Sequence, residues 1–175
     1  MYKVLGYLGR GILISGIGLS MQFAMAADAP AASADNQITI DVPVKLKHAD
    51  VVFNMDHLAF AGDMPIGMKY MELLHKKMQM DKTTGKIIGV FHGPAAYMTL
   101  NDEAYNAHRK VSTGNPYKGV IEKLIVSGVQ IEECAVSMKG NHWANKDLLP
   151  GVKVNSGAVG RIIQLSQEGY VQIEP

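Results

Sequence analysis

The residue with the clearest chemical potential is Cys134, the only cysteine in this chain of 175 residues. It ends the stretch 129–134, which we interpret as a third strand, and a short helix over 135–140 is expected to follow directly. The unpaired N–H groups and the dipole at the start of a helix favour the thiolate, which is the nucleophilic form of cysteine. Glu132 and Glu133 would oppose this effect, because nearby negative charge raises the pKa of a thiol.

Cys134 also has a purely structural interpretation. Free cysteines are among the most frequently buried residues, and a single cysteine cannot form an internal disulfide. A reactive sulfur has to be open to its partner at the sheet edge, whereas a packed sulfur is sealed among aliphatic side chains. The residue pattern leaves both interpretations open.

Other polar residues follow the ends of two further predicted strands. The strand at 50–55 contains Asn54 and is followed by His57, and the strand at 86–91 is followed by His92 and Gly93. In an open parallel sheet, ligands bind at the carboxyl ends of the strands, where these residues would meet. We therefore predict Cys134 and His92 as catalytic residues. The predicted ligand-binding residues are Asn54, His57, Gly93 and Ser137.

The histidines and methionines raise the question of a metal. No two of the six histidines have the spacing of a compact zinc site, and no H-E-x-x-H motif is present, so we expect neither metal nor cofactor. A site assembled from separate strand ends stays open. A stripe of methionines around His75 could bind Cu(I), but such a stripe more often belongs to a core or a subunit contact. Its members are Met64, Met68, Met71 and Met78.

Strand and helix patterns alternate along the chain. Ile66, Tyr70, Leu73 and Leu74 recur at helical spacing within a helix predicted over 64–80. Further helices are expected at 117–127 and 157–168, the latter capped by Ser156, and further strands at 152–154 and 170–173. Residues 38–46 are interpreted as an extended arm or an edge strand. This alternation predicts a single α/β domain with a mostly parallel five-stranded sheet, flanked by helices on both faces.

The N-terminal residues predict export. A basic start with Lys3 and Arg10, a short apolar run and the small residues Ala24 and Ala26 are typical of a cleaved signal peptide over 1–26. The alternative is a membrane anchor, but the run is shorter than the roughly 20 residues that a span requires. We expect a flexible leader over 27–37, a domain over 38–175, and a periplasmic protein without membrane association. With its near-neutral charge of +1, the chain shows no basic patch for nucleic acid.

Several segments resemble the DsrE/DsrF-like family, in its exported branch. They are Val51-Val-Phe-Asn-Met-Asp56, Val90-Phe-His-Gly-Pro-Ala-Ala-Tyr97, Gly114-Asn-Pro-Tyr117, Gly128-Val-Gln-Ile-Glu-Glu-Cys134, Asp147-Leu-Leu-Pro-Gly-Val152 and Gln167-Glu-Gly-Tyr170. The resemblance implies a parallel sheet and a homo-oligomer, often a trimer or hexamer. Family members in sulfur relays carry sulfur as a persulfide on a cysteine, and that role maps onto Cys134, with His92 as its expected neighbour.

Two functions follow as expectations. The first is a periplasmic sulfur carrier of sulfurtransferase type, which uses Cys134 and exchanges sulfur with donor and acceptor proteins. The second is a non-catalytic homo-oligomer that binds a small ligand or a metal, in which Cys134 is only a packing residue. A conventional hydrolase or dehydrogenase has little support, because the chain lacks G-x-S-x-G and a phosphate-binding glycine-rich loop.

Overall fold

The computed structural model describes residues 38–175, and the predicted signal peptide (1–26) and leader (27–37) lie outside these residues. Residues 43–175 form one compact unit. Residues 38–46 contain no strand, so the edge-strand interpretation of this segment is wrong. Within 38–175, no helix has the length and hydrophobicity needed to cross a membrane.

The centre of the fold is a five-stranded sheet in the order β6-β5-β4-β1-β7, and every neighbouring pair is parallel. The strands are β1 (Val51–Met55), β4 (Ile87–Phe91), β5 (Gln130–Cys134), β6 (Lys153–Asn155) and β7 (Val171–Ile173). The three middle strands are almost wholly buried, as expected for parallel strands covered on both faces, although β5 carries Glu132 and Glu133. The predicted α/β fold with its parallel sheet is therefore confirmed.

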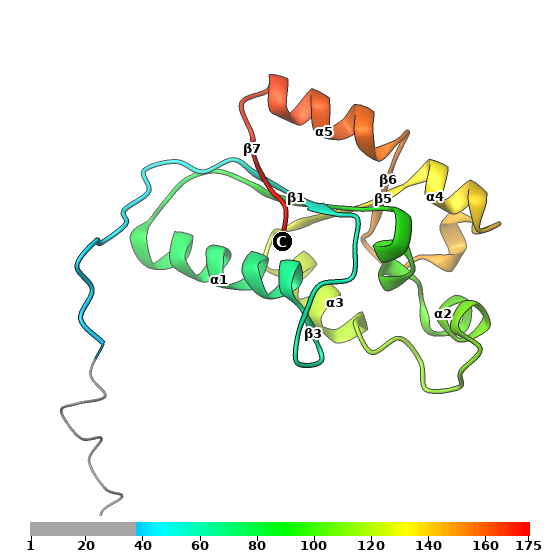
Figure 1. Ribbon diagram of the computed structural model, residues 1–175. Coiled ribbons are helices and arrows are strands. Elements are labelled where there is room, and N and C mark those ends of the chain that lie inside the picture. Colours follow the sequence, from blue (N-terminus) through cyan, green and yellow to red (C-terminus); the bar gives the residue numbers. More distant parts are fainter. Residues whose placement is uncertain (1–37) are drawn as a thin grey trace, which may run out of the picture. The chain divides into compact units, whose positions relative to one another are not determined.

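Helices cover the two faces of the sheet. Figure 1 shows α1 (Ile66–Asp81) and α3 (Lys118–Val126) on one side and α5 (Ala158–Gln167) on the other. The shorter elements are η2 (Gly93–Thr99), α2 (Asp102–Arg109), α4 (Ala135–Gly140) and η3 (Asn145–Asp147). Helix α5 starts without a side-chain cap, so the predicted cap at Ser156 is wrong.

A small hairpin that was not predicted from the sequence precedes α1. It consists of β2 (Phe60–Ala61) and β3 (Met64–Pro65), which pair antiparallel. Gly62 adopts a φ of 64° in the connecting turn, a conformation that glycine tolerates well. Because each of these strands has two residues, neither could produce a recognisable alternating pattern.

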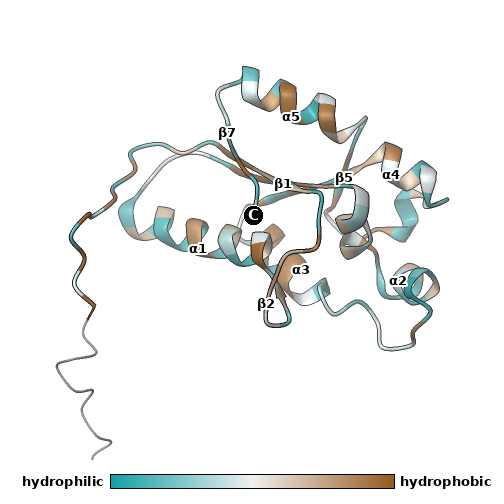
Figure 2. Cartoon of the chain, viewed as in Figure 1, coloured by the Kyte–Doolittle hydropathy of each residue, from teal (hydrophilic) through white to brown (hydrophobic). Residues whose placement is uncertain are grey.

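Two hydrophobic cores lie on opposite faces of the sheet. The larger core lies beneath α1 and α3, and the smaller one lies beneath α5. In Figure 2 the hydrophobic colours concentrate on the central strands, while the helices show both colours. This arrangement places consecutive residues of a strand in different cores, since side chains alternate between the faces.

The methionines of α1 belong to the larger core. Met68, Met71 and Met78 are buried there, which confirms that the methionine stripe is part of the core. The alternative interpretation, a Cu(I) site, is not favoured. By contrast, Tyr70 and Leu73 are about half exposed, although the helical spacing had suggested them for the inner face. The flexible methionine side chains fill the irregular space above the twisted sheet, which turns the larger apolar residues outward.

Candidate functional site

The predicted site residues meet at the carboxyl edge of the sheet. The register pairs Met55 with Phe91 and Phe91 with Glu133. One residue further along each strand, His92 therefore lies in line with Cys134. This register agrees with the prediction that His92 and Cys134 occupy neighbouring positions at the strand ends.

The Cys134 side chain faces α5 and is buried, with 4 % of the residue exposed. It belongs to the smaller core with Val52, Ile88, Val90 and Leu165. The expectation of an open sulfur at the sheet edge does not hold in this conformation. The surroundings are nevertheless polar on one side, because the backbone N–H of Ala158 donates a hydrogen bond to the sulfur at 3.3 Å.

Several hydrogen-bond donors set the acidity of Cys134. Burial raises the pKa of its thiol, but hydrogen bonds from the backbone N–H groups of Ser137, Ala158 and Val136 and from the Ser137 hydroxyl outweigh it. The net effect is a pKa below the ordinary value of cysteine. These donors come from the start of α4 and the start of α5, so the fold supplies an anion-stabilising setting around a buried sulfur.

Ser137 and Gly93 form a second layer around this sulfur. The backbone N–H of Gly93 donates to Ser137 Oγ at 3.0 Å, which leaves the serine proton free to point at Cys134. Gly93 has a φ of 54°, a conformation that glycine adopts easily and that turns the chain sharply after β4. The structure thus connects Ser137 directly to the cysteine, and Gly93 through Ser137.

His92 and Asn54 form a separate pair. Asn54 is buried, and its Nδ2 donates to both Asp56 and Glu174 at 3.3 Å. Its Oδ1 must therefore accept, and it lies 2.7 Å from His92 Nε2, which places the histidine proton on that nitrogen. Burial lowers the pKa of His92, so its imidazole is neutral and its Nδ1 can accept a proton. The hydrogen bond of His92 goes to Asn54 and not to the sulfur.

His57 lies among acidic side chains. Its Nδ1 contacts Asp56 at 2.6 Å, and this hydrogen bond raises the pKa of His57. One ligand atom from each of His57, Asp56 and Glu174 lies within 4.8 Å of the others. Imidazole and carboxylate donors together suit Zn²⁺ or Mn²⁺. The structure therefore separates His57 from the cysteine and assigns it to a cluster that could hold a cation.

Glu133 is a buried acidic residue that was not among the predicted site residues. It is fully buried on the face opposite Cys134. Thr99 Oγ1 lies 2.8 Å from Glu133 Oε2 and 3.0 Å from the Ala96 carbonyl oxygen. A hydroxyl has one proton and the carbonyl can only accept, so both contacts are satisfied when Glu133 is protonated and donates to Thr99. Burial raises the pKa of Glu133 to about 9, which agrees with this protonation.

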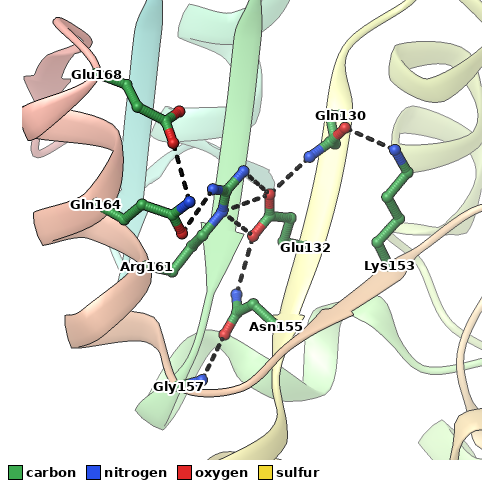
Figure 3. Close-up of polar contacts among 8 residues, drawn as sticks. All are labelled: Gln130, Glu132, Lys153, Asn155, Gly157, Arg161, Gln164 and Glu168. Carbon is green, nitrogen blue, oxygen red and sulfur yellow. Dashed lines mark hydrogen bonds and ion pairs between the residues drawn. The ribbon is translucent and has the colours of Figure 1, made fainter.

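Glu132 is held as an ion pair on the other face. Figure 3 shows the Arg161 guanidinium facing its carboxylate, with Nε at 3.1 and 3.0 Å from the two oxygens and Nη2 at 2.9 Å from Oε1. Gln130 and Asn155 donate to the same carboxylate. Glu132 and Glu133 were expected to disfavour a thiolate at Cys134 through their negative charge. In the structure, the charge of Glu132 is paired with Arg161, and Glu133 is neutral because it is protonated.

Comparison with known proteins supports this fold. Residues 47–175 match the DsrE/DsrF-like family. A protein of unknown function from Methanobacterium thermoautotrophicum, MTH1491, is similar in structure with a TM-score of 0.56 and 23% identity over 73% of this chain and 99% of that one. The ychN protein from E. coli is similar with a TM-score of 0.52 and 13% identity, over the same shares of the two chains. No curated protein matches this sequence.

Proposed function

The chain belongs to the DsrE/DsrF-like family, and on this premise we propose that it is a sulfur carrier that holds sulfane sulfur as a persulfide on Cys134. The observation that supports this most is the convergence of hydrogen-bond donors on the Cys134 sulfur. The Ala158 N–H lies 3.3 Å from it, and further donors at Ser137 and Val136 lower the pKa of the thiol despite its burial. The N–H groups at the starts of α4 and α5 lack partners within their helices, and the sulfur on which they converge is thereby favoured as an anion.

The proposed transfer needs no oxidant or reductant beyond the donor. The Cys134 thiolate attacks the outer sulfur of a donor persulfide, a new S–S bond forms at Cys134, and the donor sulfur leaves as a thiolate with the electron pair of the broken bond. An acceptor thiolate then attacks the outer sulfur, and Cys134 leaves as a thiolate. The N–H groups that favour the thiolate also stabilise the persulfide anion. His92, whose backbone position lies in register with Cys134, has its Nδ1 free and would use it to take up the proton of a neutral persulfide, –S–SH.

This proposal is tested by sulfur uptake. Purified protein treated with inorganic polysulfide and freed of excess reagent should gain the mass of at least one sulfur atom at Cys134. Dithiothreitol should remove the added mass, since a thiol is the acceptor in the second step. Protein that keeps its original mass under conditions that load a small-molecule thiol would contradict the proposal.

Export and assembly belong to the same proposal. The basic start and the Ala24-Met-Ala26 sequence support cleavage of residues 1–26 and a periplasmic location. A homo-oligomer, a trimer or hexamer, follows only from the family resemblance. The mature protein from a periplasmic extract should start at Ala27 in mass spectrometry and should elute as an oligomer in light-scattering chromatography. A protein that keeps Met1 and extracts only with detergent would refute the assignment.

The acidic cluster at the same edge favours a second candidate function, binding of a divalent cation. Calorimetric titration with Zn²⁺ should then show one site per chain, and Glu174→Gln should weaken it roughly tenfold or more, because it removes one of three ligands. His48→Ala is the matched control, since His48 and Asp50 form a similar exposed pair away from the cluster. Equal affinity of Glu174→Gln and wild type would exclude this site.

A further inference from the structure

We infer that Arg161 is a positioning residue, which holds the first turn of α5 as a closed cover over Cys134, and that opening of this turn controls access to the sulfur. The inference extends the proposed function, because it explains how a buried cysteine could meet a donor. It depends on four features of the β6–α5 region. These are the contact of Ala158 with the sulfur, the Glu132–Arg161 ion pair, the hydrogen bonds of Asn155 to Glu132 and Gly157, and Gly160 in the first turn of α5.

The cover is formed by the residue that begins α5. Ala158 is buried with 3 % exposed, and its N–H is the donor that contacts Cys134 Sγ at 3.3 Å. Cys134 and Ala158 belong to the same core. Displacing this first turn would both uncover the sulfur and remove one of the donors that stabilise its anion.

The same carboxylate holds both flanks of Ala158. Arg161, three residues later, binds Glu132 through two nitrogens, and the Glu132 side chain is only 3% exposed. Before Ala158, the Gly157 N–H donates to Asn155 Oδ1 at 3.1 Å, while Asn155 Nδ2 donates to Glu132 at 3.2 Å. Figure 3 shows this chain of contacts from Gly157 through Asn155 and Glu132 to Arg161. Glu132 lies two residues before Cys134, so it faces the same side of the sheet.

Apart from Ala158, the first turn of α5 is weakly held at its start. It has no side-chain cap, and Val159 is 70% exposed. Gly160 lies within the turn, and a Cβ placed there would meet no atom within 4 Å. Because glycine disfavours helix by roughly 1 kcal/mol relative to alanine, this turn opens more easily than its hydrogen bonds alone suggest. The polar attachment of this turn to the sheet therefore runs through Glu132, by way of Arg161 and Asn155, beside the apolar packing of Ala158.

The test is the rate at which a disulfide reagent, 5,5′-dithiobis(2-nitrobenzoic acid), labels Cys134 in the native full chain. Gly160→Ala should slow labelling by roughly two- to fivefold, because alanine stabilises the closed turn. Arg161→Gln should speed labelling at high pH, where the thiol is ionised. It should also move the midpoint of the pH–rate curve upward by roughly one unit, because the Ala158 N–H no longer stays on the sulfur.

Two controls separate this opening from global effects. Lys118→Gln removes an exposed ion pair with Asp102, which lies away from α5, and should leave labelling unchanged. At low urea the wild-type rate should hardly change, because a local opening exposes little surface. A rate that follows global stability in urea, or identical rates for wild type and Gly160→Ala, would overturn the inference. Should Arg161→Gln not fold, Gly160→Ala and the urea series still decide it.

Labelling and sulfur uptake can fail independently. The labelling reagent requires only a reachable thiol, whereas uptake requires a persulfide that persists. Labelling that responds to the α5 variants, without any sulfur uptake, would support the inference about α5 and refute the sulfur-carrier proposal. Sulfur uptake together with labelling rates that are unchanged in both α5 variants would support the sulfur-carrier proposal and refute the inference that α5 covers Cys134.

Discussion

Glu133→Gln is expected to remove most of the loss of stability that the wild-type protein shows as the pH rises from about 4.5 to about 9. These limits are the ordinary pKa of a glutamate, 4.5, and the pKa of about 9 to which burial raises Glu133. Between them the folded protein keeps a proton that the unfolded chain has lost, so stability falls with rising pH. At about 1.4 kcal/mol per pH unit, the effect has an upper bound of about 6 kcal/mol.

The measurement is the free energy of unfolding in urea at several pH values for wild type and Glu133→Gln. Glutamine keeps the shape of the protonated acid and does not ionise, so the variant should gain stability over wild type as the pH rises. Glu103→Gln, at an exposed position, provides the control and should parallel wild type. Parallel pH profiles for Glu133→Gln and wild type would show that Glu133 is not held protonated in the fold.

Cys134→Ser is expected to abolish sulfur uptake completely while leaving the fold intact. Serine keeps the size and hydrogen-bonding capacity of the side chain, and a hydroxyl is not ionised near neutral pH, so no nucleophile remains. The measurement is the intact mass after polysulfide treatment, beside a circular dichroism melt of both proteins. A Cys134→Ser protein that still gains sulfur would show that the sulfur is bound elsewhere.

Ser137→Ala is the graded companion to this substitution. It removes the hydroxyl that donates to the Cys134 sulfur, so the pKa of the thiol should rise. Uptake should therefore persist but shift to higher pH, with its rate restored once the thiol is ionised. An uptake that is lost at every pH would mean that Ser137 has a structural role only.

The order of the elements and the place of Cys134 could be read from the sequence. The apolar runs at 51–55 and 87–91 are long enough to indicate buried strands, and glycines such as Gly128 mark the ends of helices. These signals are local, because side-chain periodicity and turn chemistry act over a few neighbouring residues. The parallel sheet follows from their alternation, and with it the meeting of strand ends at one edge.

The state of the cysteine was decided by tertiary structure. Ala158 packs against the sulfur, Arg161 pairs with Glu132, and Thr99 is the hydrogen-bond partner of Glu133, which burial keeps protonated. Ala158, Arg161 and Thr99 are all distant from Cys134 in the chain. Hydrogen bonds and ion pairs depend on side chains that approach from other elements, and desolvation depends on everything packed around a group. No local pattern contains that information. The sequence therefore determined that a sulfur lies at the junction of β5 and α4, where the start of a helix favours its anion. Only the folded chain determined that this sulfur is buried against α5 and receives a further hydrogen bond from Ala158.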